Sequence, residues 1–575
     1  MDKIKFTHLK RLLTCQPYFI WHNIEDLNIS KNENDDDQFE FQMPSAIDTL
    51  DLSLEISAVQ ARTFKKVERS FFDFIKQTGR VKWIDIRLSI EDKLIETKKL
   101  MRDNGVDIIF NPVFEYEDAL SSPTFYDKRT QKISNLKISS STKRIDLIKP
   151  YFDYQVITKS GIEIKEISYF ILDTKKYNAF EIAFFETFKI NTSSTSRQSK
   201  DLKEIGDLIG IRKLKSGNGI KKNGSPYEPN SLFDIVSRAL PINNRGKIFQ
   251  FDSLKYYLRK IKEAKTAKFE GRPTKEDLSM FGNNPNIKAL IENSYPEMAG
   301  FNGKLISNKE IIEGKSLQEI SREVYIIGEI MKNKVIISDE KALKEIINKI
   351  EQKRVIWYDF EGFSLPFPTI KNYLPFQQAT FQTSIIETKN MKETNVLNHI
   401  FDPKTFNYND FPDLITQIYS NGADSYVVFN KGYENPRLKE MVQVLQEVQH
   451  PKWKECDSMV QHIIENTVDL EVPFATRSKN SLPQLLIPQL KGKSSIKLIE
   501  KYITKKNFPF AKMITPYSEL DIQNGQMAME SAINRVINII KDKEWENKQI
   551  KLKKYCENDV RAMIMVYSLI KYLLK

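Results

Sequence analysis

Two acidic residues at the end of an apolar run are the residues of this sequence best suited to do chemistry. Residues 355–361 read Val-Ile-Trp-Tyr-Asp-Phe-Glu, and their β-branched and aromatic character predicts a buried strand. Side chains alternate between the faces of a strand, so Asp359 and Glu361 are expected to project on the same side. Two neighbouring carboxylates repel each other, and a cation between them removes that repulsion. The pair therefore indicates a metal site.

Two more acids and a tyrosine, much farther along the chain, are positioned to join this pair. A second strand is predicted at Ser425–Phe429, and Glu434 follows at a strand-to-helix turn, where loop residues gather at the edge of an α/β sheet. The C-terminal helix places Tyr555 and Asp559 four residues apart, hence on a common face. We therefore expect the four acids to converge on one pocket, with the Tyr555 hydroxyl pointing into the same space.

Each of these residues also has an ordinary structural explanation. Asp-x-Glu occurs again at 469–471 and at 542–544, as chance allows in a chain with 76 acidic residues. The strand pair could consist of loop-edge acids, Glu434 could stabilise a helix N-terminus, and Tyr555 could be a core residue of an amphipathic helix. Taken together, the order of the strand acids, the turn acid and the helical Tyr-x-x-x-Asp favours a site.

The composition excludes several classes of protein. Three cysteines without a Cys-x-x-Cys pair exclude a disulfide framework and a four-thiolate metal site drawn from this chain. The net charge of +12 favours an anionic partner, nucleic acid first, although AT-rich coding sequence also enriches lysine. The N-terminus is charged where a signal peptide is apolar, and no uncharged run approaches the ~20 apolar residues that span a bilayer. We expect a soluble, cytoplasmic protein without a membrane partner.

The chain is too long for one ordinary core, so several domains are expected. Residues 1–190 indicate one α/β domain, residues 191–341 a mostly helical connector, and residues 342–575 a second α/β domain. Within the first domain, an acidic loop is predicted at 31–38. Its predicted helices and strands are an amphipathic opening at Phe6–Trp21, helices at about 46–76 and 91–102, and strands at 106–110, 154–158 and 168–172.

The ordered acids resemble the DEDD exonuclease superfamily, which has an RNase H-like fold. Its Tyr subtype fits, because Tyr555 lies four residues before Asp559, whereas Lys554 stands where the His subtype has its base. Over residues 342–575 the chain is also similar to an uncharacterised bacterial family known as domain of unknown function 2779. The segments that carry this likeness are Pro375–Gln378, Thr467–Leu470, Ser481–Pro488, Tyr517–Ala528 and Tyr555–Asp559.

The resemblance implies a two-metal site. Two Mg²⁺ or Mn²⁺ ions ~4 Å apart would be held by the four acids Asp359, Glu361, Glu434 and Asp559, and Tyr555 would orient the attacking water. One position departs from the superfamily, which usually has Asp where this chain has Glu434. Another acid, at position 469, is a candidate accessory acid, with a structural role as the alternative.

In that bacterial family a RecB-like nuclease domain, of the PD-(D/E)XK type, precedes the exonuclease-like domain. Phe6–Trp21 resembles its opening, Asn135–Lys143 its active-site strand, and Phe152–Val156 the helix after that strand, where Gln155 fits the trailing motif. The resemblance implies a restriction-endonuclease-like α/β fold for residues 1–190.

An active site of this type needs an Asp followed by Glu-x-Lys. Asp127 and Lys137 fill two of the places, but Asn135 offers a neutral amide where a carboxylate is expected. We therefore interpret the N-terminal domain as a degenerate nuclease fold, with a working site as the alternative. Lys137, Lys143 and Arg144 are expected to contact a phosphate backbone, unless they form only a solvated turn.

These features predict a metal-dependent nuclease, a 3′–5′ exonuclease acting on DNA or RNA. The alternative is a catalytically inactive nucleic-acid-binding or scaffold protein made of two degenerate nuclease folds. Glu434 and Asn135 both favour that alternative, because each departs from the residue that the corresponding active site uses.

Overall fold

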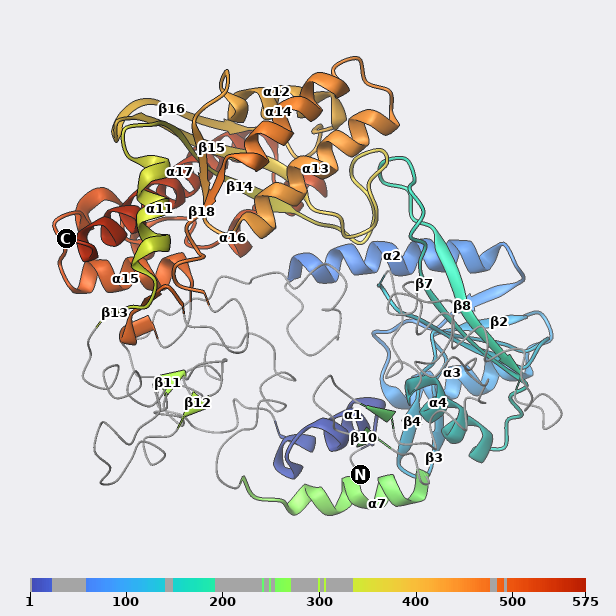
Figure 1. Cartoon of the computed structure of the whole chain (residues 1–575). Coiled ribbons are helices and arrows are strands. Elements are labelled where there is room, and N and C mark those ends of the chain that lie inside the picture. The colour runs from blue at the N-terminus through green and yellow to red at the C-terminus, as the bar shows by residue number, and fades with distance from the viewer. Residues whose placement is uncertain are drawn as a thin grey trace, which may run out of the picture. The chain divides into compact units, whose positions relative to one another are not determined.

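The computed structural model shows two compact units, and both are mixed α/β as the sequence predicts (Figure 1). The structure describes residues 3–22, 58–139, 148–191, 240–241, 248–249, 254–269, 298–299, 305–306, 335–475, 483–490 and 494–575. The first unit comprises Met1–Glu33, Pro44–Lys175 and Glu181–Ile291, and the second comprises Asn34–Met43, Lys176–Phe180 and Glu292–Lys575. The predicted acidic loop at 31–38 lies outside the described residues.

The first unit is built on a six-stranded sheet of order β1-β2-β5-β6-β7-β8. The pairs β1–β2 and β6–β7 are parallel, and the other neighbours are antiparallel. Its elements are α1 (Phe6–Thr14), α2 (Ala58–Lys76), β1 (Val81–Trp83), α3 (Ile90–Arg102), β2 (Ile108–Phe110), β3 (Phe114–Tyr116), β4 (Ala119–Ser121), β5 (Phe125–Asp127), β6 (Lys132–Leu136), α4 (Ile148–Lys159), β7 (Glu166–Leu172), β8 (Phe184–Asn191) and α7 (Leu254–Glu263).

Helices cover both faces of this sheet because its strands are apolar on both sides. Phe71 of α2 packs with Phe110, Phe125 and Phe170 on one face. On the other face, residues of α1, α4 and α7 pack with neighbouring strand residues such as Ile167. Alternation along β7 sends Ile167 and Phe170 to opposite faces, so one strand contributes to both cores.

One predicted strand of this unit is wrong. Residues 154–158 read Tyr-Gln-Val-Ile-Thr, which favours a strand by composition, but they lie within helix α4. Phe152 and Val156 are both buried, and their four-residue spacing is that of one helix face. A window of five residues was too short to show this period. A helix at 152–156, the alternative expectation for this segment, is present as part of α4.

A stretch that the sequence assigns to the connector packs on the first unit. Leu254, Leu258 and Ile261 of α7 are buried in the core that α1 and α4 share, and Trp21 Nε1 donates a hydrogen bond to the Ile261 carbonyl at 2.7 Å. Around α7, the structure describes only two short antiparallel strand pairs, β9–β10 (Leu240–Pro241, Ile248–Phe249) and β11–β12 (Met298–Ala299, Leu305–Ile306).

The second unit is built on a five-stranded sheet of order β16-β15-β14-β17-β18. Its elements are β13 (Ile336–Ile337), α11 (Glu340–Ile350), β14 (Arg354–Phe363), β15 (Ala379–Lys389), β16 (Lys392–Ile400), α12 (Phe411–Tyr419), β17 (Ser425–Val428), α13 (Lys431–Glu447), α14 (Trp453–Glu465), β18 (Thr467–Asp469), β19 (Leu485–Leu486), α15 (Ile496–Lys505), α16 (Gly525–Val536) and α17 (Asp542–Leu573). β16, β15 and β14 are antiparallel, whereas β14, β17 and β18 are parallel.

Strand β14 lies at the centre of this sheet and is covered on both faces. The Trp357 ring contacts Tyr567 of α17 edge-on at 5.8 Å, so α17 covers the face to which Trp357 points. Ile356 is in register with Tyr426 of β17, whose ring meets His462 of α14, so α14 covers the opposite face. Asp359 and Glu361 follow Trp357 at two-residue steps and therefore share the α17 face.

No helix among the residues that the structure describes has the length and apolar character needed to cross a membrane.

Candidate active site

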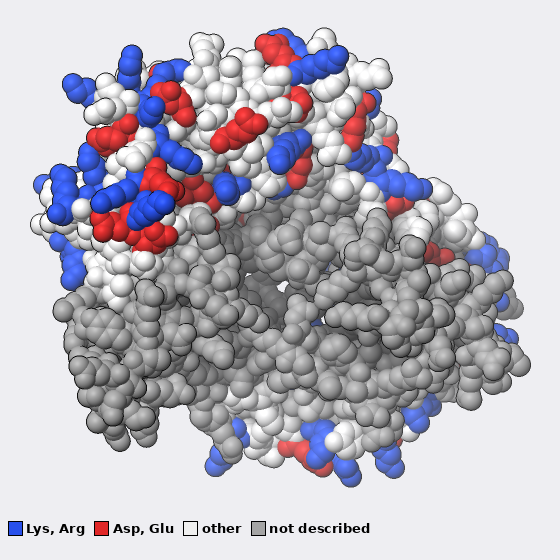
Figure 2. Space-filling view, in the orientation of Figure 1, with Lys and Arg blue, Asp and Glu red and all other residues white. Residues whose placement is uncertain are grey.

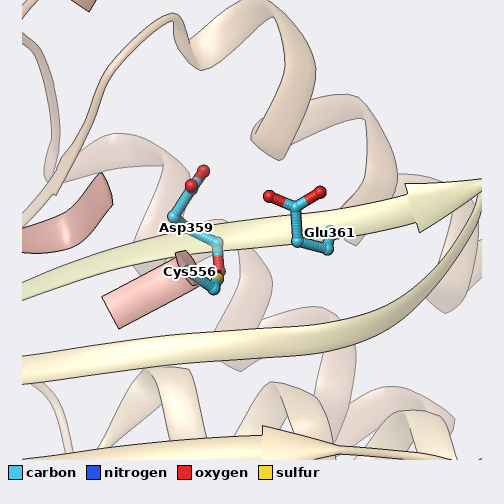
Figure 3. Close-up of side chains that lie close together, drawn as sticks. All are labelled: Asp359, Glu361 and Cys556. Carbon is cyan, nitrogen blue, oxygen red and sulfur yellow. Dashed lines mark hydrogen bonds between the residues drawn. The ribbon is translucent and has the colours of Figure 1, made fainter. Parts of the chain in front are cut away.

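The acid pair of β14 is oriented as the strand period requires. Figure 3 shows the carboxylates of Asp359 and Glu361 projecting from the same side of the strand, with Cys556 of α17 beside them. Ligand atoms of these three residues all lie within 4.8 Å of one another. The Cys556 thiol also contacts the Asp359 carbonyl, with 3.8 Å between sulfur and oxygen. The long C-terminal helix is thus packed directly against the acid pair.

Asp559 approaches the same place from α17. Burial raises the pKa of the Cys556 thiol well above its usual value, and the carboxylates of Asp359 and Glu361 raise it further. The Asp559 carboxylate, one turn along the helix, raises it as well. Only nearby charges have such an effect, because Coulomb energy falls with distance. Asp559 lies three residues after Cys556 on α17, hence on the same side of that helix as the thiol that contacts β14.

Glu434 reaches the cluster from the first turn of α13. It is 2 % exposed. Burial raises the pKa of the neighbouring Tyr433 hydroxyl, and the carboxylates of Glu361 and Glu434 raise it further. A Cβ at Gly362 would come within 2.6 Å of that hydroxyl, so glycine is needed where Tyr433 packs on β14. The start of α13 is thereby held against the strand that carries the acid pair.

The N-terminus of α16 also faces the cluster. A Cβ on Gly525, the first residue of α16, would lie 3.7 Å from Glu361 Oε2. The preceding Asn524 caps this helix, since its side chain accepts a hydrogen bond from the Met527 amide at 3.0 Å. The partial positive charge of a helix N-terminus stabilises a nearby carboxylate. Part of the repulsion within the cluster is therefore offset by the fold itself.

Lys497 and Tyr517 belong to this site, and the sequence reasoning missed both. Lys497 of α15 is 7 % exposed, and its ammonium donates to the Tyr555 hydroxyl at 3.3 Å and to the Gln523 carbonyl at 3.1 Å. The Tyr517 hydroxyl donates a hydrogen bond to Asp559 Oδ1. The Lys497 ammonium also lies over the rings of Tyr517 and Tyr555, at 4.9 and 5.4 Å from their centroids. These contacts fix the position of Tyr555 and bring a positive charge to the edge of the acid cluster.

Asp469 has a structural role in this arrangement. Its Oδ1 accepts hydrogen bonds from the backbone amides of Asn430 and Glu471, both at 3.0 Å. These bonds tie the end of β17 to the residues after β18. Asn430 has the positive φ of 79° that turns the chain into α13, so Asp469 acts on the cluster only by holding the turn that precedes Glu434.

In the first unit, Asn135 is bonded to Asp153 and Lys149, two residues that the sequence does not indicate as part of a site. Asn135 Nδ2 donates to Asp153 Oδ2 at 3.1 Å, and the Lys149 ammonium donates to that oxygen at 2.7 Å and to Asn135 Oδ1 at 2.6 Å. Ser121 Oγ donates to the other oxygen of Asp153 at 2.8 Å. Asp153 is 1 % exposed, and its charge is balanced by the ammonium of Lys149 from the preceding turn of the same helix.

The other residues proposed for the N-terminal half lie elsewhere or are not described. Asp127 pairs with Arg129 at the turn between β5 and β6, with the guanidinium 2.7 Å from its Oδ2, so the structure does not bring it to Asn135. Lys137 directly follows β6, two residues after Asn135. Gln155 lies half-buried on α4. Lys143 and Arg144 fall outside the described residues.

The second unit matches a family model of unknown function. Residues 356–495 match the model described as Domain of unknown function (DUF2779), and this segment holds Asp359, Glu361 and Glu434. The chain is similar to an uncharacterized protein of Mycoplasma genitalium, at 28 % identity over 86 % of this chain and 82 % of that protein. A homologous uncharacterized protein of Mycoplasma pneumoniae is 26 % identical over 85 % and 83 % of the two chains.

A third relative covers a smaller part. An uncharacterized protein of Ureaplasma parvum is 35 % identical over 41 % of this chain and 33 % of its own length. No solved structure matches the chain. These findings support the likeness to a family of unknown function, and since none of the matches has a described activity, they assign no chemistry to the site.

Proposed function

We propose that this protein is a metal-dependent nuclease whose second unit removes nucleotides from the 3′ end of DNA or RNA. The observation that carries the proposal is the approach of acids from three elements that are far apart in the sequence, namely β14, α13 and α17. Ligand atoms of Asp359 and Glu361 lie within 4.8 Å of the Cys556 sulfur, and Asp559 follows Cys556 on α17 by about one helical turn. Glu434 follows Tyr433, whose hydroxyl packs on β14 at Gly362. Collecting like charges is costly unless a cation balances them.

The architecture supports the folds that the resemblance implies. In the second unit, the acid pair lies on the central strand of a mixed sheet, and the C-terminal helix with the last acid crosses that strand. This arrangement supports an RNase H-like fold. In the first unit, a mixed sheet with helices on both faces supports a restriction-endonuclease-like fold.

The donor set fits divalent cations that prefer oxygen ligands. Asp359, Glu361, Glu434 and Asp559 offer carboxylate oxygens only, which suits Mg²⁺ or Mn²⁺. Bound there, such ions would activate a water and stabilise the leaving 3′ oxygen. Glu434 and Asp559 are 2 % and 4 % exposed, so these two carboxylates are shielded from solvent.

The remaining residues of the site orient the reactants. The Tyr555 hydroxyl, held by the Lys497 ammonium, is the group best positioned to direct a water. Lys497 also brings a positive charge that favours a phosphate. In this proposal, Tyr517 keeps the Asp559 carboxylate in one orientation through its hydrogen bond.

Incubation of the full chain with labelled single-stranded DNA and RNA tests the proposal. Mg²⁺ or Mn²⁺ should produce shortening from the 3′ end, and a chelator should stop it. Asp359→Asn should abolish shortening while leaving the melting temperature unchanged or higher, because it removes one of several repelling charges. Asp413→Asn, at an exposed carboxylate of α12, is the matched control and should leave the activity unchanged. If no substrate is shortened with either metal, the enzyme assignment is wrong.

A non-catalytic nucleic-acid-binding or scaffold protein is the second candidate. The observation that favours it is the Asn135, Lys149 and Asp153 cluster of the first unit, where an ammonium already balances the buried carboxylate. In this candidate, the first unit has a nuclease-like fold in which an internal ion pair has replaced the metal site. Binding of single strands without shortening in the same assay would support this candidate.

A further inference from the structure

Helix α15 and the residues that follow it carry a run of positive charge that extends from the carboxylate cluster toward solvent. Between Ile496 and Ser518 the sequence has five lysines and a single acid, Glu500. That acid is 4 % exposed and is bonded by Thr504 Oγ1 at 2.8 Å. The exposed side of this segment is therefore basic. Figure 2 shows Lys and Arg interspersed with Asp and Glu over the face of the second unit that it draws.

The lysines of α15 form a stripe that begins at the site. Lys497, Lys501 and Lys505 follow one another at four-residue steps and so share one face of the helix, with a rise of about 6 Å per step. Lys497 lies buried against Tyr555, whereas Lys501 and Lys505 are exposed. The stripe thus leads from the cluster to the solvent.

Aromatic residues lie where the stripe ends. The rings of Phe508 and Phe510 are stacked, with 5.5 Å between centroids and 12° between planes. The Tyr572 ring meets Phe508 edge-on at 5.3 Å and is 49 % exposed. Because Lys497 contacts Tyr555 and Phe508 contacts Tyr572, α15 runs along α17 from the acid cluster toward the C-terminus. Phe508 and Phe510 are half-buried, so Tyr572 is the ring of this cluster that is open to solvent. Positive charge combined with an accessible aromatic ring is the pattern that binds single strands through phosphates and base stacking.

We propose that the α15 stripe, Lys497, Lys501 and Lys505 with the Phe508–Phe510–Tyr572 aromatic cluster, binds a single-stranded nucleic acid and leads its 3′ end into the carboxylate cluster. The proposal rests on the proposed nuclease function for its direction, and on charge and ring geometry for the binding itself. The eight residue steps from Lys497 to Lys505 span about 12 Å, which corresponds to roughly 3–4 nucleotides at ~3.4 Å per stacked nucleotide.

Binding of labelled single strands to the full chain in EDTA tests the stripe, since divalent-dependent cleavage is then absent. The Lys501→Gln/Lys505→Gln double variant should weaken binding of a hexanucleotide at least tenfold. The slope of log affinity against log salt should fall by about 1.4, at about 0.7 per phosphate contact on a single strand. Tyr572→Ala should weaken binding with an unchanged salt slope, because stacking releases no counterions. DNA and RNA hexamers, tested in parallel, show which backbone the stripe prefers.

The matched control is Lys452→Gln/Lys454→Gln at the start of α14, which removes two exposed lysines of the same unit and should change the affinity less than twofold. An unchanged salt slope in the α15 variant would overturn the proposal, and so would an equal loss of affinity for a blunt duplex. The two proposals can fail separately. If the α15 double variant loses single-strand binding and the wild-type protein shortens no substrate with either metal, the stripe is upheld and the nuclease function is refuted.

Discussion

At the scale of single residues, Lys497 is a buried cation that contacts Tyr555 at the edge of the acid cluster. It is 7 % exposed, and a buried ammonium is costly unless oxygen atoms or aromatic rings surround it. Here a tyrosine hydroxyl, a carbonyl and two rings do so. If the nuclease proposal is right, this residue positions Tyr555 for the reaction.

Replacement of Lys497 tests that role. Lys497→Met should lower kcat by roughly 10²-fold, the loss seen when one preorganised donor leaves an active site, with a smaller effect on KM. Lys497→Arg should restore part of kcat, because it keeps the charge although its planar fork fits the same space poorly. Single-turnover kinetics and thermal melting of both variants provide the measurement. Equal losses of activity in the two variants, following equal losses of melting temperature, would show a purely structural role.

The sequence predicts the acids of this site but not their neighbours. Asp359 and Glu361 are recognisable because a strand period relates them, and Tyr555 and Asp559 because a helix period does. Lys497 is 58 residues from the tyrosine that it contacts, and no local period connects the two. The Lys149 ion pair is local, four residues along α4, yet its importance comes from the burial of Asp153, which the sequence alone does not reveal.

At the scale of elements, the central strand of the second unit is held in register by an ion pair at its start. Arg354 of β14 binds Glu387 of β15 through two hydrogen bonds, of 2.8 and 3.1 Å. The bond from the guanidinium holds the pKa of Glu387 below its ordinary value of 4.5. A carboxylate with a lowered pKa stabilises the fold at pH values above 4.5, and this contribution is lost as the pH falls through the lowered value.

Glu387→Gln should therefore make the second unit less sensitive to acid. We expect the wild type to lose about 1 kcal/mol more unfolding free energy than the variant between pH 5 and pH 3, the size of a partly exposed pair. Urea unfolding at a series of pH values measures this difference. Glu345→Gln, at an exposed glutamate of α11, is the control. Parallel pH profiles for the wild type and Glu387→Gln would contradict the prediction.

Elements with a strong period were predicted well, whereas composition alone misled. The strand at 355–361, the strand at 425–429 and the C-terminal helix are present as β14, β17 and α17. Residues 154–158 have a strand composition but form part of α4, because burial at helical spacing outweighs β propensity. The predicted helix at 46–76 begins at Ala58 in the described part of the chain.

At the scale of the whole molecule, the two units differ in how the negative charge of their buried carboxylates is balanced. The second unit gathers four carboxylates from one strand, β14, and two helices, α13 and α17. The first unit has Asp153 bonded to Lys149 and Asn135, so its buried carboxylate already has a cation. Since that ammonium takes the position between the two oxygen ligands, a divalent ion would have to displace it.

All divalent-dependent cleavage should therefore come from the second unit. Asp359→Asn should abolish it, whereas Lys149→Met should leave it within about twofold, although breaking a buried pair costs the first unit about 3 kcal/mol. Lys137→Ala should also keep cleavage of short substrates, and should weaken binding of longer strands with a salt slope lowered by about 0.7. Cleavage rates of the three variants on substrates of two lengths, together with their melting temperatures, show which unit carries out the cleavage. Cleavage that survives Asp359→Asn but disappears in Lys137→Ala would assign the chemistry to the first unit instead.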